Sequence, residues 1–353
     1  MDKLWLTLVV IALGIIVAIT GLKYNFINLN NLSLESFINI LEKDNTEKGP
    51  PVEEKKPIFY SPLTGEEVTY DLLYITPLAV VIDNQVSARP PSGINRADII
   101  YEVPIEGGIT RFLAIFQSQL PEKIGPVRSL RLAFLDIVNE YSAVLVHCGG
   151  DSRALKKISS GAVKIKDLDE MKSGGYFWRD RNLIPPYNLF TSSGNLQKAK
   201  KDRDWENLSE PLKLFNFTPP AEEKGIIFKV EIKNSTYAYS VQWTFNPEKN
   251  LYERNQGGSL HTENPGNEVL TTQNLLVLTT RGAITTKLGH LDLDIVGEGK
   301  AYLFKNGNSL EASWIKKSPS TRLEIYDLEG KEITLNPGRI WITIITDSKK
   351  LAY

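Results

Sequence analysis

The chain has 353 residues, 42% of them hydrophobic and 24% charged, and a formal net charge of −1. Such a composition is typical of a globular protein with one or two cores, and it excludes a largely disordered chain. Without a global charge excess, nucleic acid is not an expected partner. One cysteine excludes an intrachain disulfide, and three histidines form no zinc-binding pattern, so the sequence predicts no metal site and requires no cofactor.

The first feature along the chain is an uncharged apolar run from Leu4 to Leu22. At ~1.5 Å per residue, this run nearly crosses a ~30 Å hydrocarbon layer. The run is longer than a signal-peptide core and no small-residue cleavage pattern follows it, so residues 1–22 are predicted to be an uncleaved transmembrane signal anchor, with cleavage as the alternative. Residues 23–57 are rich in Asn, Glu and Lys, which predicts a flexible tether. We therefore expect a single-pass cell-membrane protein whose C-terminal region is extracytoplasmic.

Residues 58–205 are predicted to form an α+β or α/β domain with a mixed sheet, because apolar strand-like runs alternate with helical spacing. In chain order, the elements are strands over 77–83, 97–103 and 109–117, a helix over 130–141, and a strand over 143–148. The PIEGG segment between the second and third strands predicts an antiparallel hairpin. Ser129 is the predicted N-cap of the helix.

Polar residues fall at the ends of predicted strands, where open α/β sheets bind ligands. Asp83 ends the first buried strand, His147 nearly ends the last strand, and Asp151 follows the next two glycines. If the two strands are parallel, these side chains lie at one edge of the sheet. The alternatives are a turn-capping role for Asp83 beside Asn84 and a hydrogen-bonded core position for His147. For His147 we favour the core position.

Arginines provide a second signal in the segment GPVRSLR, where Arg128 and Arg131 flank the predicted helix start. Cations are disfavoured there by about 0.3–1 kcal/mol each, so the pair indicates a compensating anion. That anion is either a set of internal carboxylates or a bound phosphate or carboxylate, and we favour the bound ligand. Arg111 lies in an apolar strand roughly opposite Glu102, which favours a cross-strand ion pair. Arg89 is a further candidate for the same cleft.

The segment 177–192, FWRDRNLIPPYNLFTS, concentrates aromatic residues, arginines and prolines in a predicted loop. Loops of this composition are enriched at recognition surfaces, and Arg179 and Asn188 are the candidate ligand-binding residues in it. A lid over the core is an equally open alternative.

Residues 206–224 are a predicted linker, marked by Pro219-Pro220 and the acidic residues after them. From 225 to 353 the pattern changes to short strands separated by turn residues, which predicts a mostly β domain folded as a sandwich or a barrel. Charged residues alternate with apolar ones there, so we predict no catalytic constellation in this part. His261 is a predicted loop residue.

Several distinctive sequence motifs are spread along the predicted globular region. They are PLTGE (62–66), AVVIDN (79–84), ARPPSGINRADIIYEVPIEGGITRFLAIF (88–116), VHCGG (146–150), YERNQGG (252–258), GEGKAYLFKNG (297–307) and LNPGRIWI (335–342). Together they resemble the bacterial YerB-like lipoprotein family, whose two parts are domains of unknown function. The resemblance implies a bacterial envelope protein that faces outward, and it implies no particular activity.

The sequence departs from that family's pattern at two places. Lipoprotein members carry a cysteine after the signal region for lipid attachment, whereas the first cysteine here is Cys148, so anchoring would depend on the helix itself. Where the family commonly has Pro-His-Asn, this chain has Pro186, Tyr187 and Asn188. A general-base or metal-ligand role for that histidine therefore does not carry over.

We predict a non-catalytic envelope protein that binds a protein or a cell-wall polymer through the Arg128/Arg131 edge and the loop 176–192. The alternative is a metal-dependent enzyme acting on an anionic, phosphate-containing substrate, with Asp83 on a divalent cation and arginines on the phosphates. Geometry separates the two hypotheses. Convergence of Asp83 and the arginines on one cleft would favour the enzyme, and separate pairing with Glu102, Glu106 and Asp136 would count against it.

Overall fold

The computed structural model describes residues 57–234 and 236–353, which include a compact unit from Ile58 to Tyr353. The predicted anchor, and the predicted tether except for Pro57, lie outside the described residues. Within the part that is described, no helix is long and apolar enough to cross a membrane.

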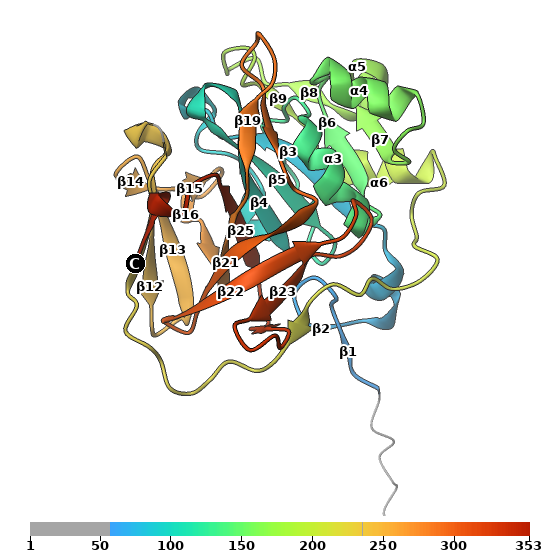
Figure 1. Ribbon diagram of the computed structural model, residues 1–353. Coiled ribbons are helices and arrows are strands. Elements are labelled where there is room, and N and C mark those ends of the chain that lie inside the picture. Colours follow the sequence, from blue (N-terminus) through green and yellow to red (C-terminus); the bar gives the residue numbers. More distant parts are fainter. Residues whose placement is uncertain (1–56, 235) are drawn as a thin grey trace, which may run out of the picture. The chain divides into compact units, whose positions relative to one another are not determined.

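A ten-stranded mixed sheet is the centre of this unit (Figure 1). Its strands, in spatial order, are β23 (Glu324–Asp327), β22 (Asn308–Lys316), β21 (Gly297–Lys305), β18 (Asn274–Thr279), β25 (Ile340–Ile345), β4 (Ile99–Pro104), β5 (Thr110–Phe116), β3 (Leu78–Asp83), β6 (Val144–His147) and β7 (Lys166–Asp169). Strands β4 and β5 form the predicted antiparallel hairpin, which is thereby confirmed. Strand β3 is antiparallel to β5 and parallel to β6.

The sheet combines strands from both predicted globular parts. Strand β25, near the end of the chain, lies between β18 and β4 and is parallel to both. All six of its residues are buried, so it needs a neighbour on each side and a layer on each face. The mixed α+β first part and the mostly β second part are confirmed. The second part does not form a sandwich or barrel of its own, because β18, β21, β22, β23 and β25 join the sheet of the first part. Residues 206–224 separate the two parts in the sequence, but strands from both parts lie in the same ten-stranded sheet.

Helices and a second, smaller sheet cover the two faces of the central sheet. The helices are α3 (Leu132–Val138), α4 (Ser152–Ser159), α5 (Glu170–Ser173) and α6 (Ser193–Lys201). The second sheet consists of β14 (Ser259–Leu260), β13 (Leu251–Gln256), β12 (Val241–Asn246), β11 (Lys229–Ile232) and β26 (Leu351–Ala352), with β17 (Thr271–Thr272) beside β13. The remaining strands are short: β1 (Phe59–Tyr60), β2 (Glu67–Val68), β8 (Trp178–Arg179), β9 (Leu189–Phe190), β10 (Asn216–Phe217), β15 (Thr262–Glu263), β16 (Glu268–Val269), β19 (Gly282–Ile284), β20 (Leu291–Leu293) and β24 (Thr334–Leu335).

Alternation along the central strands assigns neighbouring residues to opposite cores. Val81 packs in the core that contains Phe134 of α3, together with residues of α4. The adjacent residue Val80 packs in the other core, which contains Trp243 of β12 and Trp341 of β25. Each core is therefore built from both halves of the sequence, which explains why the halves fold as one unit.

The helix predicted over 130–141 is shorter than expected. Helix α3 begins after Arg131, and no side chain caps its first turn, so the predicted N-cap role of Ser129 is wrong. The reason is local pairing: the N–H of Leu130 donates to the carbonyl of Gly149 at 3.0 Å, which holds Leu130 in an extended segment. Residues 139–141 continue the helix as a single 3₁₀ turn.

Candidate functional site

Asp83 and His147 lie at the same edge of the central sheet, because β3 and β6 are parallel neighbours. The segment containing Arg128 crosses this edge and is fixed on both sides. Its N–H donates to the carbonyl of Val81 at 2.9 Å, and its carbonyl accepts from the N–H of Cys148 at 3.1 Å. The backbone thus holds Arg128 over the carboxyl ends of both strands.

Asp83 and Arg128 form an ion pair at this edge. Arg128 Nε lies 2.6 Å from Asp83 Oδ2, and only 1% of the Asp83 side chain is exposed. The second carboxylate oxygen, Oδ1, accepts from the N–H of Gln85 at 3.1 Å, so Asp83 also caps the turn after its strand. The Arg128 guanidinium lies over the Tyr187 ring, 5.2 Å from its centroid. Both oxygens of Asp83 therefore have donors within the protein.

Arg131 binds Glu106 with two hydrogen bonds in a fork-to-fork arrangement, one of them 2.7 Å long from Nε to Oε2. Burial alone would raise the pKa of Glu106, but the hydrogen bonds and charge of Arg131 outweigh it and lower that pKa to about 2. The compensating anions for Arg128 and Arg131 are thus internal carboxylates, so the prediction of a bound anion as their partner is wrong.

Arg111 is the cation at this edge that lacks an acidic partner. In the sheet it stands opposite Val103 and Asp83, whereas Glu102 stands opposite Phe112. The predicted pair between Arg111 and Glu102 is therefore wrong, because a one-residue difference in register puts the two side chains on opposite faces.

The guanidinium of Arg111 is buried with few partners. Nη1 donates to the carbonyl of Ser129 at 2.7 Å, while Nε has no hydrogen-bond partner and the side chain forms no ion pair with any described residue. Burial lowers the pKa of Arg111 to about 10, with a further contribution from the charge of Arg131, while the charges of Asp83 and Glu106 oppose this shift from a distance. We call Asp83, Glu106, Arg111, Arg128 and Arg131 the arginine edge. It contains three positively charged guanidinium groups and two negatively charged carboxylates.

Arg89 is a predicted site residue that has a structural role. Its Nε and Nη2 donate to the carbonyl of Asn84 at 3.1 and 2.9 Å, and its Nη1 donates to the carbonyl of Ala238 at 2.8 Å. The guanidinium also lies 4.9 Å from the centroid of the Tyr239 ring. Arg89 thus joins the turn after β3 to the 3₁₀ turn before β12 (residues 237–239), and its donors are used there and not at the arginine edge.

His147 is a fully buried side chain with a partner on each ring nitrogen. Nε2 lies 2.7 Å from Asp167 Oδ1, and Nδ1 lies 2.8 Å from the carbonyl oxygen of Gly149. This arrangement is that of a hydrogen-bonded core histidine.

The remaining predicted site residues also form contacts within the protein. Asp151 caps helix α4 and lies 2.7 Å from Arg153 Nη2. Arg179 contacts Asn188 Oδ1 at 3.3 Å and Glu170 Oε1 at 3.4 Å. The structure therefore brings Asp83, Arg111, Arg128 and Arg131 together and leaves Arg89, His147, Asp151, Arg179 and Asn188 outside that group.

Sequence reasoning missed a buried polar network between the two sheets. Arg254 Nη2 lies 2.9 Å from Glu102 Oε1, and both side chains are fully buried. Arg254 Nε donates to His261 Nδ1 at 3.1 Å, and Thr110 Oγ1 donates to the same Glu102 oxygen at 2.8 Å. One signal was available, because alternation in LYERNQ puts Arg254 on the same face as the aromatic Tyr252.

The arrangement of acids does not favour the metal-dependent enzyme. Asp83 uses its oxygens for Arg128 and Gln85, and Glu106 uses both of its oxygens for Arg131. Across the described ranges, His, Cys, Asp and Glu side chains form no group of three or more that could hold a metal ion. Two of the arginines that were expected to reach a phosphate are thus paired with carboxylates.

Comparison with known proteins confirms the resemblance. Residues 63–206 match the N-terminal domain, and residues 229–342 the C-terminal domain, of the family described as "Protein of unknown function (DUF3048)". A Bacillus subtilis (strain 168) protein named "Putative lipoprotein YerB" is 33% identical over 290 residues, which cover 81% of this chain and 86% of that protein. The crystal structure of the YerB protein from Bacillus subtilis matches with a TM-score of 0.75 and 32% identity, over 83% of this chain and 99% of that chain.

Proposed function

The chain belongs to the DUF3048 family, and from this premise we propose that it is a membrane-anchored envelope protein that binds an anionic partner at the arginine edge. The lipoprotein name of its relative supports an envelope location associated with the membrane. The partner is an acidic cell-wall polymer or an acidic protein surface.

The anchor in this proposal is the apolar run from Leu4 to Leu22, with the globular unit on the extracytoplasmic side. A helical anchor suits a chain whose first cysteine is Cys148, far beyond any site for lipid attachment. A reporter that is active only outside the cytoplasm, fused after Tyr353, tests the topology. A fusion that is stably made but inactive would contradict it.

The observation that carries the binding proposal is the unmatched charge of Arg111. A buried cation without a counter-ion is costly, and sites that bind charged ligands are where proteins retain such groups. Arg128 and Arg131, in the same cluster, expose 20% and 13% of their side chains. Asp83 and Glu106 remain the partners of these two arginines, and an incoming anion would approach their exposed parts to compensate the excess positive charge of the cluster.

The loop beside the arginine edge supplies apolar contact area. Strands β8 and β9 pair and present the loop between them, in which Leu183 is 42% and Ile184 is 79% exposed. Backbone hydrogen bonds from Leu183 to Asp180 and from Tyr187 to Ile184 fold the loop into two consecutive turns. Because Tyr187 packs on Arg128, this loop adjoins the charged cluster. Exposed apolar side chains next to arginine are typical of recognition surfaces.

Photo-cross-linking in intact cells tests the proposal. A photoreactive residue in place of Ile184 is expected to capture a partner, and the same residue in place of Leu288, which is 79% exposed on the β19–β20 hairpin, is the control. The Arg111→Met replacement should abolish capture at position 184. Loss of the adduct on muramidase digestion would identify a wall polymer, and loss on protease digestion of the captured species would identify a protein. Equal capture at both positions, or capture unaffected by Arg111→Met, would exclude the arginine edge.

A further inference from the structure

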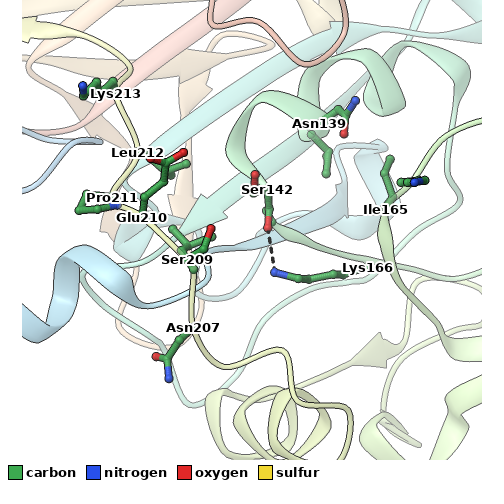
Figure 2. Close-up of a pocket in the computed structure, with 14 residues that line it drawn as sticks. Asn139, Ser142, Ile165, Lys166, Asn207, Ser209, Glu210, Pro211, Leu212 and Lys213 are labelled. Atoms are coloured by element: carbon green, nitrogen blue, oxygen red, sulfur yellow. Dashed lines mark hydrogen bonds between the residues drawn. The ribbon is translucent and has the colours of Figure 1, made fainter.

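A pocket with a volume of about 570 Å³ lies away from the residues of the arginine edge. It opens between the turn around Ser142, the start of β7 at Lys164 to Lys166, and the extended segment 207–213. Figure 2 shows Ser142 and Lys166 on one side and Ser209 to Lys213 on the other. The volume falls within the range of pockets that hold small molecules, roughly 300–1,000 Å³.

The segment that forms one wall is the sequence predicted to be a linker. Asn207 bridges to Ile75 in an antiparallel pair, and Leu214 is buried in the core next to α3. Beyond it, β10 pairs with β24. Contacts at both ends thus hold residues 207–213 across the opening, so the pocket is a preformed feature of the fold.

The charged side chains of this pocket are mostly lysines. Lys164, Lys166 and Lys213 line it together with one acid, Glu210. None of these lysines forms an ion pair with any residue that the structure describes. The Lys166 ammonium has only two hydrogen bonds, to Thr76 Oγ1 and to the carbonyl of Ser142, and both are 3.4 Å long. A better acceptor in the pocket would replace these long contacts.

A buried lysine behind the pocket adds to the positive charge. Lys200 donates to the carbonyl of Thr76 at 2.7 Å and has no carboxylate partner among the described residues. Burial and the nearby charge of Lys166 lower the pKa of Lys200 to about 8, and Glu206 is the acid that opposes this shift. Four ammonium groups thus stand against two carboxylates, Glu206 and Glu210, and two positive charges remain unmatched.

We propose that this pocket binds a phosphate monoester, with the phosphate held by Lys166 and with the charges of the two rim lysines, Lys164 and Lys213, favouring its entry. A phosphate dianion matches the two unmatched charges. Lysine ammonium groups bind phosphate as point charges, whereas the planar carboxylate is matched best by arginine, which is absent from the lining. The apolar side chains of Val138, Ile165 and Leu212 provide a surface for the organic part of the ester.

Calorimetric titration of the full-length chain in a non-ionic detergent, at constant ionic strength, tests this site. The probes are inorganic phosphate and glycerol 3-phosphate. Lys166→Gln should weaken the binding of both by tenfold or more, because it removes the central donor. Lys201→Gln is the matched control: Lys201 is the exposed neighbour of Lys200 and does not line the pocket, so its replacement should leave the affinity unchanged.

Two further variants keep the test decisive. Lys164→Gln with Lys213→Gln changes only exposed side chains, so it should fold normally and still weaken binding tenfold. Arg111→Met should leave phosphate binding intact, because Arg111 contributes nothing to the pocket. Affinity unchanged in Lys166→Gln, or lost in Arg111→Met alone, would overturn the proposal. Tighter binding of glycerol 3-phosphate than of phosphate would support an ester ligand, and binding of inorganic phosphate alone would overturn that part.

Discussion

Two buried arginines, Arg254 and Arg111, differ in whether a carboxylate forms an ion pair with the guanidinium. Arg254 is fully buried and has Glu102 at 2.9 Å, with the Trp341 ring 4.6 Å from its guanidinium carbon. Arg111 is almost as deeply buried, but it has a single carbonyl as its acceptor and no acid. Burial lowers the pKa of both arginines. Arg254 has a counter-ion in direct contact, whereas Asp83 and Glu106 favour the charge of Arg111 only from a distance.

This contrast shows that a buried charge is not by itself a sign of a ligand site. Glu102 accepts from Arg254 and Thr110 and lies near the indole N–H of Trp341, so its network joins the central sheet to the second sheet. The charge of this pair is balanced within the protein, although Arg254 Nη1 and His261 Nε2 have no hydrogen-bond partner among the described residues. At the arginine edge, three guanidinium groups share the two carboxylates of Asp83 and Glu106, and this excess of one positive charge favours an external anion.

The largest expected effect is on the matched pair. Arg254→Met leaves Glu102 buried without a counter-ion, so the free energy of unfolding should fall by about 3–5 kcal/mol. Urea unfolding followed by tryptophan fluorescence measures the loss, since Trp243 and Trp341 flank the site. Adding Glu102→Gln should restore much of the stability. A loss below about 1 kcal/mol in the single variant would mean that Arg254 is not the counter-ion of Glu102.

The next effect concerns the two matched arginines of the arginine edge. Replacing both Arg128 and Arg131 with Gln leaves Asp83 and Glu106 without their ion pairs, and Asp83 is buried. We expect a loss of about 2–4 kcal/mol, visible as a lowered midpoint in thermal melts. An unchanged or raised midpoint would show that these arginines are held for an external anion, and would remove the distinction between them and Arg111.

The sequence predicted the position of this edge better than its pairing. Strand β3 and the β4–β5 hairpin follow from local patterns, and the parallel arrangement of β3 and β6 places Asp83 and His147 at the edge that the Arg128 segment crosses. Strand register is harder to predict. The observed register differs by one residue from the predicted one, so Arg111 and Glu102 lie on opposite faces of the sheet and do not pair.

The order of strands that are distant in the chain could not be predicted from the sequence either. Residues 340–345 are an apolar run that any buried strand would show, and nothing local indicates that it pairs with β4 from more than 200 positions earlier in the chain. That pairing is what brings the second sheet over Glu102 and buries Arg254. The burial of an arginine in an alternating strand therefore depends on contacts that the local pattern does not contain.

A smaller effect is the acid dependence contributed by Glu106. Its pKa is lowered from 4.5 to about 2 despite burial, chiefly by hydrogen bonds to Arg131. Because the folded state favours the ionised form, the stabilisation is fully present above pH 4.5 and is lost as the pH falls toward 2, by roughly 2–3 kcal/mol in total. Unfolding measured from pH 6 to 2 should show a shallower loss in Glu106→Gln. Glu329→Gln, an exposed control, should follow the wild type, and parallel curves for all three proteins would contradict the pairing.

The smallest change in stability is expected for Arg111→Met, the variant on which the proposed binding site depends most. Arg111→Met removes a buried charge that has no counter-ion, and this relieves a desolvation cost. It also removes one hydrogen bond to the carbonyl of Ser129, worth about 0.5–1.5 kcal/mol, while the methionine retains most of the apolar stem. The two contributions oppose each other, so the free energy of unfolding should change by no more than about 1 kcal/mol in either direction. Urea unfolding of Arg111→Met beside Arg254→Met makes the comparison direct, since the two variants delete the same group from equally buried positions. Similar large losses in both would mean that Asp83 and Glu106 already neutralise Arg111, and the arginine edge would then be a closed ionic network with no charge left for a partner.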